Sequence, residues 1–240
     1  MSTEPKKFKL GYWKMKGLAH VPRMMFAVRG VEYDNEMYAC VKREDGSWDR
    51  SAWSRDAYPT LCAEKTPFCN LPYLELPDGS FMVQSNAILR HLARVLDLYG
   101  STDEERRLID EIHENMIDLR NTCVRSAYGS YEADRESLAK DVLPYYIGGL
   151  EQTYLKGDGD HFLVGGRLSF ADLYVYDVCV IIHAMCDNAL VDKYPKVQKF
   201  VAKIRALPEL AEFFSSPLAT LPFNNPSAKF AGEHQPSPAG

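Results

Sequence analysis

The sequence lacks any apolar run long enough to cross a lipid bilayer. Its most apolar stretch, residues 173–185, is about 13 residues long and contains Asp177 and His183, whereas a membrane-spanning helix needs roughly 20 apolar residues. The first residues contain no apolar segment of the kind found in signal peptides. We therefore expect a cytoplasmic protein.

Long basic runs and metal-binding patterns are missing as well. The formal net charge is −5, from 28 basic and 33 acidic residues, which argues against nucleic acid or an anionic membrane as the main partner. The cysteines form no CxxC pair, and no two histidines stand three or four residues apart. HExxH, GxSxG and complete glycine-rich phosphate loops do not occur. We expect free thiols and no metal site.

The composition is that of a globular protein. The 240 residues are 46% hydrophobic and 25% charged, enough for one large domain or two small ones with a real core. Up to about residue 97 the pattern alternates between strand and helix: strands at 7–12 and 31–38, a helix at 17–29, a hairpin of 71–76 with 80–83, and a helix at 84–96. Residues 42–67 read as a long irregular segment.

The second half reads as helical. Capping boxes at Thr102 and Ser169 each begin a helix, and the helix after Ser169 is apolar nearly all round, which predicts the buried centre of a bundle. Further helices are expected at 138–155, bent or begun by Pro144, and at 194–207 and 209–214. Residues 223–240 read as a tail. The predicted class is a two-domain α+β protein, with βαβ-ββα followed by an all-helical domain and a boundary near 97–101.

Three local features could form a binding site, and each also has a purely structural interpretation. Tyr12 ends the first expected strand and could face a cleft or pack in the core. Pro72 opens a strand, where a cis bond would expose the preceding backbone to an extended ligand, although proline is also tolerated at such an edge. Ser85 begins a helix, where it could cap that helix or help bind a carboxylate.

Four motifs in order extend these features: residues 10–20 (LGYWKMKGLAH), 49–53 (DRSAW), 70–74 (NLPYL) and 84–90 (QSNAILR), with SFADL and YVYDV at 169–178 in the second half. Together they resemble the cytosolic glutathione S-transferases, most closely the mu class, over roughly residues 7–222. The resemblance implies a thioredoxin-like glutathione-binding domain (1–97), an all-helical domain with the electrophile site (101–222) and a C-terminal tail (223–240). It also implies a homodimeric detoxification enzyme that uses glutathione as co-substrate.

Residue roles follow from the same resemblance. Tyr12 matches the tyrosine whose hydroxyl hydrogen-bonds the glutathione sulfur. Positions that match the rest of the glutathione site are Trp13, Leu18, Arg50, Trp53, Asn70, Leu71, Pro72, Gln84, Ser85 and Asp118, the last reaching across the dimer. Candidate walls of the electrophile pocket are Met15, Ile117, Asn121 and Val124, with Tyr128 as a donor to a developing oxyanion. Phe68 matches an aromatic key inserted into the partner subunit, and Arg90 an arginine at the two-fold axis.

The chain also departs from the family pattern. Arg55-Asp56-Ala57 occupies the stretch where mu enzymes have a lysine for the glycine carboxylate, and Lys65 is the candidate replacement. The expected activity is conjugation of glutathione to small hydrophobic electrophiles. Two alternatives stay open: a glutathione-dependent isomerase or peroxidase of the sigma type, and a non-catalytic ligand-binding or structural relative.

Overall fold

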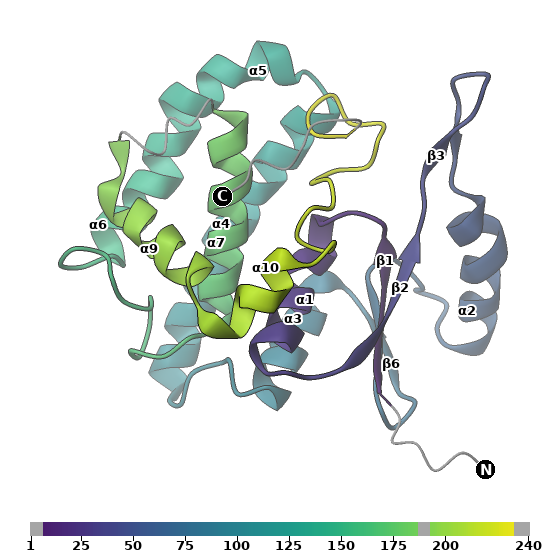
Figure 1. Cartoon of the computed structure of the whole chain (residues 1–240), viewed down its shortest axis with the longest axis horizontal. Helices are drawn as coiled ribbons and strands as arrows, with labels where there is room; N and C mark the ends of the chain where they lie inside the picture. The colour runs from purple at the N-terminus through teal and green to yellow at the C-terminus, as the bar shows by residue number, and fades with distance from the viewer. Residues whose placement is uncertain (1–6, 187–192, 233–240) are drawn as a thin grey trace.

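A four-stranded mixed sheet forms the N-terminal half of the chain (Figure 1). The computed structural model describes residues 7–186 and 193–232. Strand order is β2-β1-β5-β6, with β1 and β2 parallel and the other neighbours antiparallel. The strands span Phe8–Trp13 (β1), Tyr33–Tyr38 (β2), Tyr73–Glu75 (β5) and Phe81–Val83 (β6). This is the thioredoxin-like arrangement that the resemblance implies, and it agrees with the βαβ-ββα order of elements read from the pattern.

Helices α1 (His20–Val28) and α3 (Ser85–Val95) lie between this sheet and the helical half of the molecule (Figure 1). The short η1 turn (Gly17–Ala19) precedes α1, so Pro22 falls in the first turn, where its missing N–H costs no helical hydrogen bond. Helix α3 buries Ile88, Leu89 and Leu92 along one side. The apolar spacing of both helices thus decides which side they turn to the core.

The expectation of an irregular segment at 42–67 is wrong. Strands β3 (Val41–Lys42) and β4 (Trp48–Asp49) pair as a hairpin, followed by η2 (Ala52–Ala57) and α2 (Tyr58–Glu64). The hairpin turn contains Asp45-Gly46, with Gly46 at φ +81°, and α2 lies on the far side of the sheet from α1 (Figure 1). The segment is ordered because Trp53 packs into a small separate core with Tyr38, Cys69 and Tyr73.

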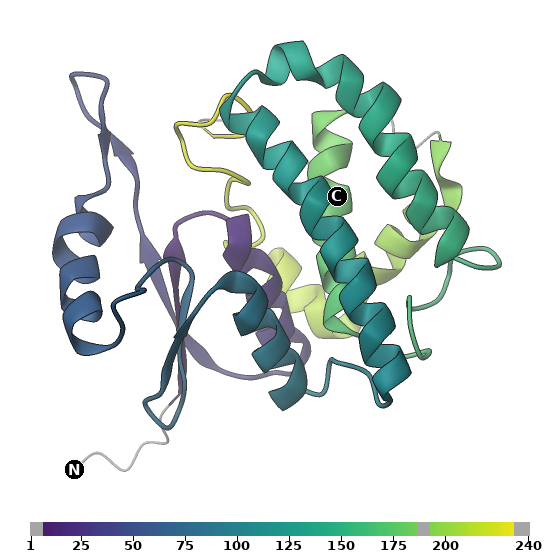
Figure 2. The ribbon, with the colours of Figure 1, turned by 180° about the vertical axis from the view of Figure 1, so that it is seen from behind.

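Helix α7 (Phe170–Met185) runs through the centre of the helical half, beside the long helix α4 (Asp103–Tyr128) (Figure 2). Both predicted capping boxes are formed, by Thr102 with Glu105 and by Ser169 with Asp172. The other segments are α5 (Tyr131–Ser137), the π-helical η3 (Leu138–Val142) and η4 (Pro144–Gly148), α6 (Gly149–Thr153), α9 (Pro195–Arg205), η5 (Pro208–Leu210) and α10 (Ala211–Ser215). Helical structure therefore begins at residue 131, earlier than the expected 138, and Pro144 begins a new segment.

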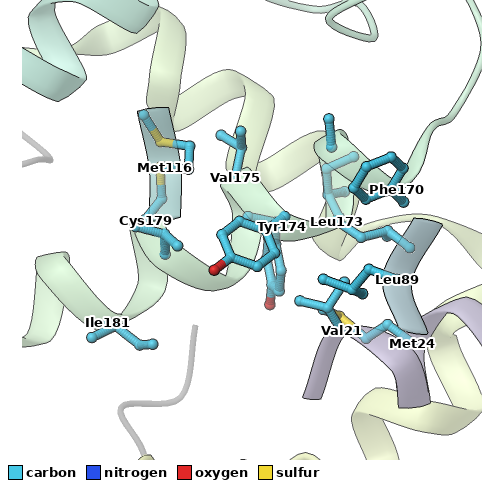
Figure 3. Close-up of a cluster of buried hydrophobic side chains, with 14 of the residues drawn as sticks. Val21, Met24, Leu89, Met116, Phe170, Leu173, Tyr174, Val175, Cys179 and Ile181 are labelled. Carbon is cyan, nitrogen blue, oxygen red and sulfur yellow. The ribbon is translucent and has the colours of Figure 1, made fainter. Parts of the chain in front are cut away.

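The two halves share one apolar core (Figure 3). Side chains that meet there include Val21 and Met24 from α1, Leu89 from α3, Met116 from α4, and Phe170, Leu173, Tyr174 and Val175 from α7. Several of these side chains are completely buried. Because this core locks α1 against α7, the carboxyl end of β1 is held at a fixed position relative to α4.

The C-terminal segment 222–232 folds back onto the molecule instead of trailing as a tail. Phe223 and Phe230 are 2% and 5% exposed. The backbone N–H groups of Lys229 and Phe230 donate to the Ala127 carbonyl near the end of α4. In Figure 1 this yellow segment runs from α10 past the start of α1 towards the end of α4. Residues 233–240 of the expected tail lie outside the described residues.

Candidate active site

Tyr12 lies at the carboxyl end of β1 and is almost buried, at 5% exposed. Two glycines allow close packing around Tyr12, because a side chain at either position would clash. A Cβ on Gly11 would lie 2.1 Å from the Tyr73 ring, and a Cβ on Gly17 would lie 2.8 Å from the Tyr12 hydroxyl. Burial raises the pKa of that hydroxyl above its ordinary value, while Arg120 and a backbone hydrogen bond from Leu18 act in the opposite direction. The phenol is therefore neutral and able to donate a hydrogen bond at physiological pH.

The turn after Tyr12 is clasped by the C-terminal segment. The Lys16 and Gly17 backbone N–H groups donate to the Pro222 and Phe223 carbonyls at 2.8 and 3.2 Å. The Lys16 ammonium lies 4.4 Å from the centre of the Phe223 ring, a cation–π contact. Residues about 210 positions apart in the sequence thus fix the same turn beside Tyr12.

The segment before β5 carries the proposed backbone-binding residues. The Leu71–Pro72 peptide bond is cis, which is one of the two states left open from the sequence. Asn70 is exposed, and its Oδ1 accepts a hydrogen bond from the Leu71 N–H at 2.8 Å. Trp53, which is 9% exposed, packs against Tyr73 in the small separate core. Leu71 packs against the same core, which therefore supports the segment before β5.

The amino end of α3 has an unusual backbone. Gln84 is a non-glycine residue at φ +75°, a conformation that costs roughly 1–3 kcal/mol and is typical of functional sites. The structural interpretation of Ser85 as the N-cap is wrong: Gln84 holds that position, Ser85 begins the helix, and no side chain makes the capping hydrogen bond. The first turn of α3 therefore presents amide N–H groups and the positive end of the helix dipole without a side-chain cap.

The basic candidates differ in their partners. Arg50 follows β4, is exposed, and its guanidinium lies 3.5 Å from the Ser227 hydroxyl of the C-terminal segment. Lys65 pairs with Glu75 at 3.5 Å. A ligand carboxylate would have to compete with Glu75 for Lys65, whereas Arg50 has no carboxylate partner among the described residues.

Helix α4 faces this region with the remaining candidates. Met15, in the turn after β1, is buried, Ile117 and Val124 are half-buried, and Asp118 and Asn121 are exposed. Tyr128 is 37% exposed, and its hydroxyl oxygen accepts a hydrogen bond from the Asn225 N–H at 2.9 Å. The structure therefore brings the β1 turn, α4 and the C-terminal segment together around the candidate electrophile residues.

The two predicted dimer residues lie elsewhere on the surface. Phe68 is 78% exposed. Arg90 forms ion pairs with Asp110 at 2.8 Å and with Glu114 of α4. A cavity of about 300 Å³ opens between α4 and the η4–α6 segment. Its lining includes Ile112, Met116, Tyr145, Tyr146 and Leu150.

Other kinds of site find no support in the part of the chain that the structure describes. No group of three or more His, Cys, Asp or Glu side chains among these residues is arranged to hold a metal ion. No helix within residues 7–186 and 193–232 is both long and apolar enough to cross a membrane. The six cysteines are free thiols, four of them buried.

Comparison with known proteins agrees with this geometry. The glutathione S-transferase N-terminal domain family matches residues 8–94, and the C-terminal domain family matches residues 117–217. Human glutathione S-transferase Mu 3 is 31% identical over 225 residues, covering 93% of this chain and 95% of that protein. The chain belongs to the glutathione S-transferase family. The rat Mu 5 protein is 32% identical over 95% of this chain and 97% of its own length.

The pi class is similar as well. Bovine glutathione S-transferase P is 31% identical over 86% of this chain and 90% of its own length. The solved structure of a pi-class glutathione S-transferase from Onchocerca volvulus superposes with a TM-score of 0.76 at 26% identity, over 92% of this chain and 99% of that one. The glutathione S-transferase fold of this chain is thus common to both classes.

Two residues beside the candidate site are not identified by the sequence motifs. Asn225, in the supposed tail, bonds Tyr128, and Arg120 of α4 is only 8% exposed. The signal for the first was the pair of phenylalanines, Phe223 and Phe230, in an otherwise polar segment. The signal for the second was a basic residue within the apolar spacing of α4.

Proposed function

We propose that this protein conjugates the thiolate of glutathione to small hydrophobic electrophiles. Residues 1–97 serve as the glutathione-binding domain and 101–222 as the domain that carries the electrophile site. The observation that carries the proposal is Tyr12: a buried, neutral phenol at the carboxyl end of β1, facing α4 and next to a family-matched binding segment. The names of the relatives, glutathione S-transferases of the mu and pi classes, support the same reaction.

Tyr12 activates the nucleophile. A free thiol with a pKa of about 8.5 is only a few per cent ionised at pH 7, and lowering that pKa by about two units requires roughly 2.7 kcal/mol. One hydrogen bond to a charged acceptor contributes about 1.5–3 kcal/mol. A single phenol therefore supplies most of the activation, provided that it keeps its proton, and burial of Tyr12 favours the protonated form.

Glutathione is bound along the edge of the N-terminal domain. Leu71 pairs its backbone with the cysteinyl unit, Gln84 and Ser85 hold the γ-glutamyl carboxylate at the start of α3, and Arg50 provides positive charge. The remaining contacts come from Trp13, Leu18, Trp53, Asn70 and Pro72, with Lys65 as a further candidate for the glycine carboxylate. The uncapped first turn of α3 supports the carboxylate site, because helix N-termini bind anions.

The electrophile lies between Tyr12 and α4. Met15, Ile117, Asn121 and Val124 form the walls, and Tyr128 donates a hydrogen bond to an oxygen on the electrophile. The C-terminal segment supports this assignment, because Asn225 already donates to the Tyr128 oxygen and leaves the hydroxyl proton for another acceptor.

The active form is a homodimer. Phe68 of each subunit inserts into the partner, where the cavity of about 300 Å³ between α4 and the η4–α6 segment receives it. An aromatic side chain that is 78% exposed in the monomer supports this arrangement, since large apolar side chains buried in partner pockets are typical interface hot spots. Arg90 lies at the two-fold axis, and Asp118 reaches the γ-glutamyl amine bound to the other subunit.

The first experiment is the ultraviolet difference spectrum of bound glutathione, titrated over pH for the wild type and for Tyr12→Phe. We expect a thiolate band in the wild type well below pH 8.5. In Tyr12→Phe the band moves to higher pH and kcat falls, while glutathione affinity changes little, because the variant removes a bond made to the ionised sulfur.

The control is Tyr33→Phe, which removes a hydroxyl from a neighbouring strand outside the proposed site. Glutathione binding without a thiolate band would contradict conjugation and favour a carrier role. A thiolate band without conjugation of any electrophile would favour an isomerase or peroxidase.

A further inference from the structure

Two of the six cysteines lie in one loop, directly before the segment proposed to bind glutathione. Cys62 is half-buried near the end of α2, and Cys69 is 6% exposed and immediately precedes Asn70. Of the other four thiols, three belong to the main core and one follows β2. The proposed conjugation uses neither Cys62 nor Cys69.

The chain turns back on itself between these two cysteines. The Thr66 N–H donates to the Leu61 carbonyl at 3.3 Å, which closes the end of α2. The Cys62 sulfur lies 3.8 Å from the Pro67 carbonyl oxygen, a contact suited to the weak S–H donor. The Cys69 N–H donates to the Thr66 carbonyl at 3.2 Å. Consecutive turns thus fold the end of the loop back towards the Cys62 side chain.

Both thiols also contact the same small core. Cys69 is a member of this core, together with Tyr38, Trp53 and Tyr73, and Cys62 packs against it from α2. Burial, with a smaller contribution from the Cys62 thiol, raises the pKa of Cys69. The two sulfurs therefore lie within electrostatic range of each other on one side of the loop.

The two thiols differ in access. Cys62 is half-buried, so a small oxidant reaches its sulfur, and the Tyr58 hydroxyl hydrogen-bonds to it. Cys69 is covered by the aromatic side chains of the small core. An accessible thiol next to a second thiol is the usual arrangement of a redox-active cysteine pair. Cys62 is thus the site of first attack, and Cys69 the resolving thiol.

We propose that Cys62 and Cys69 form a redox-active dithiol, which hydroperoxides oxidise to an intrachain disulfide that lowers the affinity for glutathione. The effect on affinity rests on the proposed function, whereas formation of the disulfide does not. The pair is a modification site within the N-terminal domain.

The oxidation balances without any further reactant. The Cys62 thiolate attacks one peroxide oxygen, an S–O bond forms, the O–O bond breaks, and the other oxygen leaves as water or alcohol after taking a proton. Cys69 then attacks the Cys62 sulfur, so that the S–S bond forms and the hydroxyl leaves as water with the Cys69 proton. Two thiols of glutathione reverse the step by exchange and become glutathione disulfide.

The position of the pair explains the effect on binding. The bond would close a ring over residues 62–69, which contains Lys65 and the exposed Phe68. Disulfide geometry is narrow, and a close-packed core yields only by moving its neighbours. Because Asn70 and Leu71 follow Cys69 directly, they move with its backbone. The backbone hydrogen bonds proposed for Leu71 are therefore weakened in the oxidised protein.

The test treats the purified wild type with hydrogen peroxide, removes the excess with catalase and counts thiols in denaturant. We expect two of the six thiols to be lost, and peptide mapping by mass to join residues 62 and 69 through a disulfide. S-methylglutathione, which cannot reduce a disulfide, then measures affinity by isothermal titration. We expect its Kd to rise about tenfold on oxidation, the value of one hydrogen bond to the ligand, and to return after dithiothreitol.

Three variants serve as controls. Cys40→Ser removes the other half-buried thiol and should behave like the wild type. Cys62→Ser should keep its affinity for S-methylglutathione after peroxide, and Cys69→Ala should stop at a Cys62 sulfenic acid that dimedone labels. If Cys69→Ala does not fold, Cys62→Ser decides the question.

The inference has clear contrary outcomes. Retention of all six thiols after peroxide, a disulfide between other cysteines, or an oxidised protein with unchanged affinity would overturn it. Reduced wild type that does not bind S-methylglutathione would instead overturn the proposed function, and the peptide map would still decide whether the disulfide forms.

Discussion

At the scale of single residues, the site depends on side chains held in costly states. Tyr12 is buried with a raised pKa, Arg120 is buried with no hydrogen bond or ion pair to another described residue, and Gln84 has a backbone conformation that non-glycine residues rarely adopt. The states of Arg120 and Gln84 cost free energy that the surrounding core must offset, whereas the raised pKa of Tyr12 keeps its phenol protonated. Strained backbones and buried charges of this kind are typical of functional sites.

Gln84 gives a direct test of this trade-off. We expect Gln84→Gly to be more stable than Gln84→Ala by about 1 kcal/mol, because glycine adopts a positive φ without strain. Glutathione affinity should fall by a similar factor in both variants, because both lack the amide side chain. Urea unfolding and isothermal titration with glutathione measure the two effects. If Gln84→Gly keeps full affinity, the side chain of Gln84 does not contribute to binding.

At the scale of secondary-structure elements, the α4–α7 contact contains an unusual histidine. His113 of α4 is fully buried, and its ring meets the rings of Phe170 and Tyr174 edge-on at 5.0 and 4.5 Å. Neither ring nitrogen has a hydrogen-bond partner among the described residues. Burial, with a further effect of Arg90, lowers the pKa of His113 to about 4, against the opposite effects of Glu114 and Asp110.

That pKa predicts a loss of stability in acid. Above pH 6.5 the imidazole is neutral in both the folded and the unfolded chain. As the pH falls from 6.5 towards 4, only the unfolded chain takes up the proton, so folding becomes less favourable. At pH 5 the cost is about 2 kcal/mol, from about 1.4 kcal/mol for each pH unit below 6.5. Burial raises the pKa values of Asp172 and Asp177 to about 6, which acts in the opposite direction.

The effect of His113 is isolated by comparing His113→Leu with the wild type. Urea unfolding at pH 7 and pH 5, at one protein concentration, gives the change in unfolding free energy for each protein. Between pH 7 and pH 5, the free energy of unfolding of the wild type should fall by about 2 kcal/mol more than that of His113→Leu. The same pH dependence in both proteins would show that His113 accepts a proton without cost.

At the scale of the whole molecule, two long-range arrangements complete the site. The C-terminal segment ties the turn after Tyr12 to the end of α4, and the proposed dimer brings Asp118 to the other subunit's glutathione. Both arrangements make binding depend on parts of the chain that are distant from Tyr12 in sequence.

The dimer proposal predicts that Phe68→Ser weakens association at least about 30-fold, because loss of an interface hot spot costs about 2 kcal/mol or more. Glutathione affinity should fall with it, because Asp118 of the other subunit is lost from the site. Sedimentation velocity over a range of concentrations and titration with glutathione measure the two effects. Val41→Ser, which changes another exposed apolar side chain, is the control. An unchanged dimer in Phe68→Ser would show that Phe68 is not the key.

The sequence by itself determined the elements whose signals are local. Apolar periodicity and capping boxes predicted strands β1, β2, β5 and β6 and helices α1, α3, α4, α7 and α9, and the four motifs predicted the family. These signals are local because a helix side or a cap depends on residues three or four positions apart. They also placed Tyr12 at the end of a strand and Ser85 at the start of a helix, which the structure shows.

Only the tertiary structure decided the rest. Residues 41–64 are ordered because Trp53 packs against Tyr38 of β2 and Tyr73 of β5. The segment 222–232 is held by carbonyl and N–H groups of residues 16, 17 and 127. Arg120 is buried where α7 packs beside α4. Polar segments carry little apolar pattern of their own, so the free energy that orders them comes from distant partners that a local pattern cannot identify.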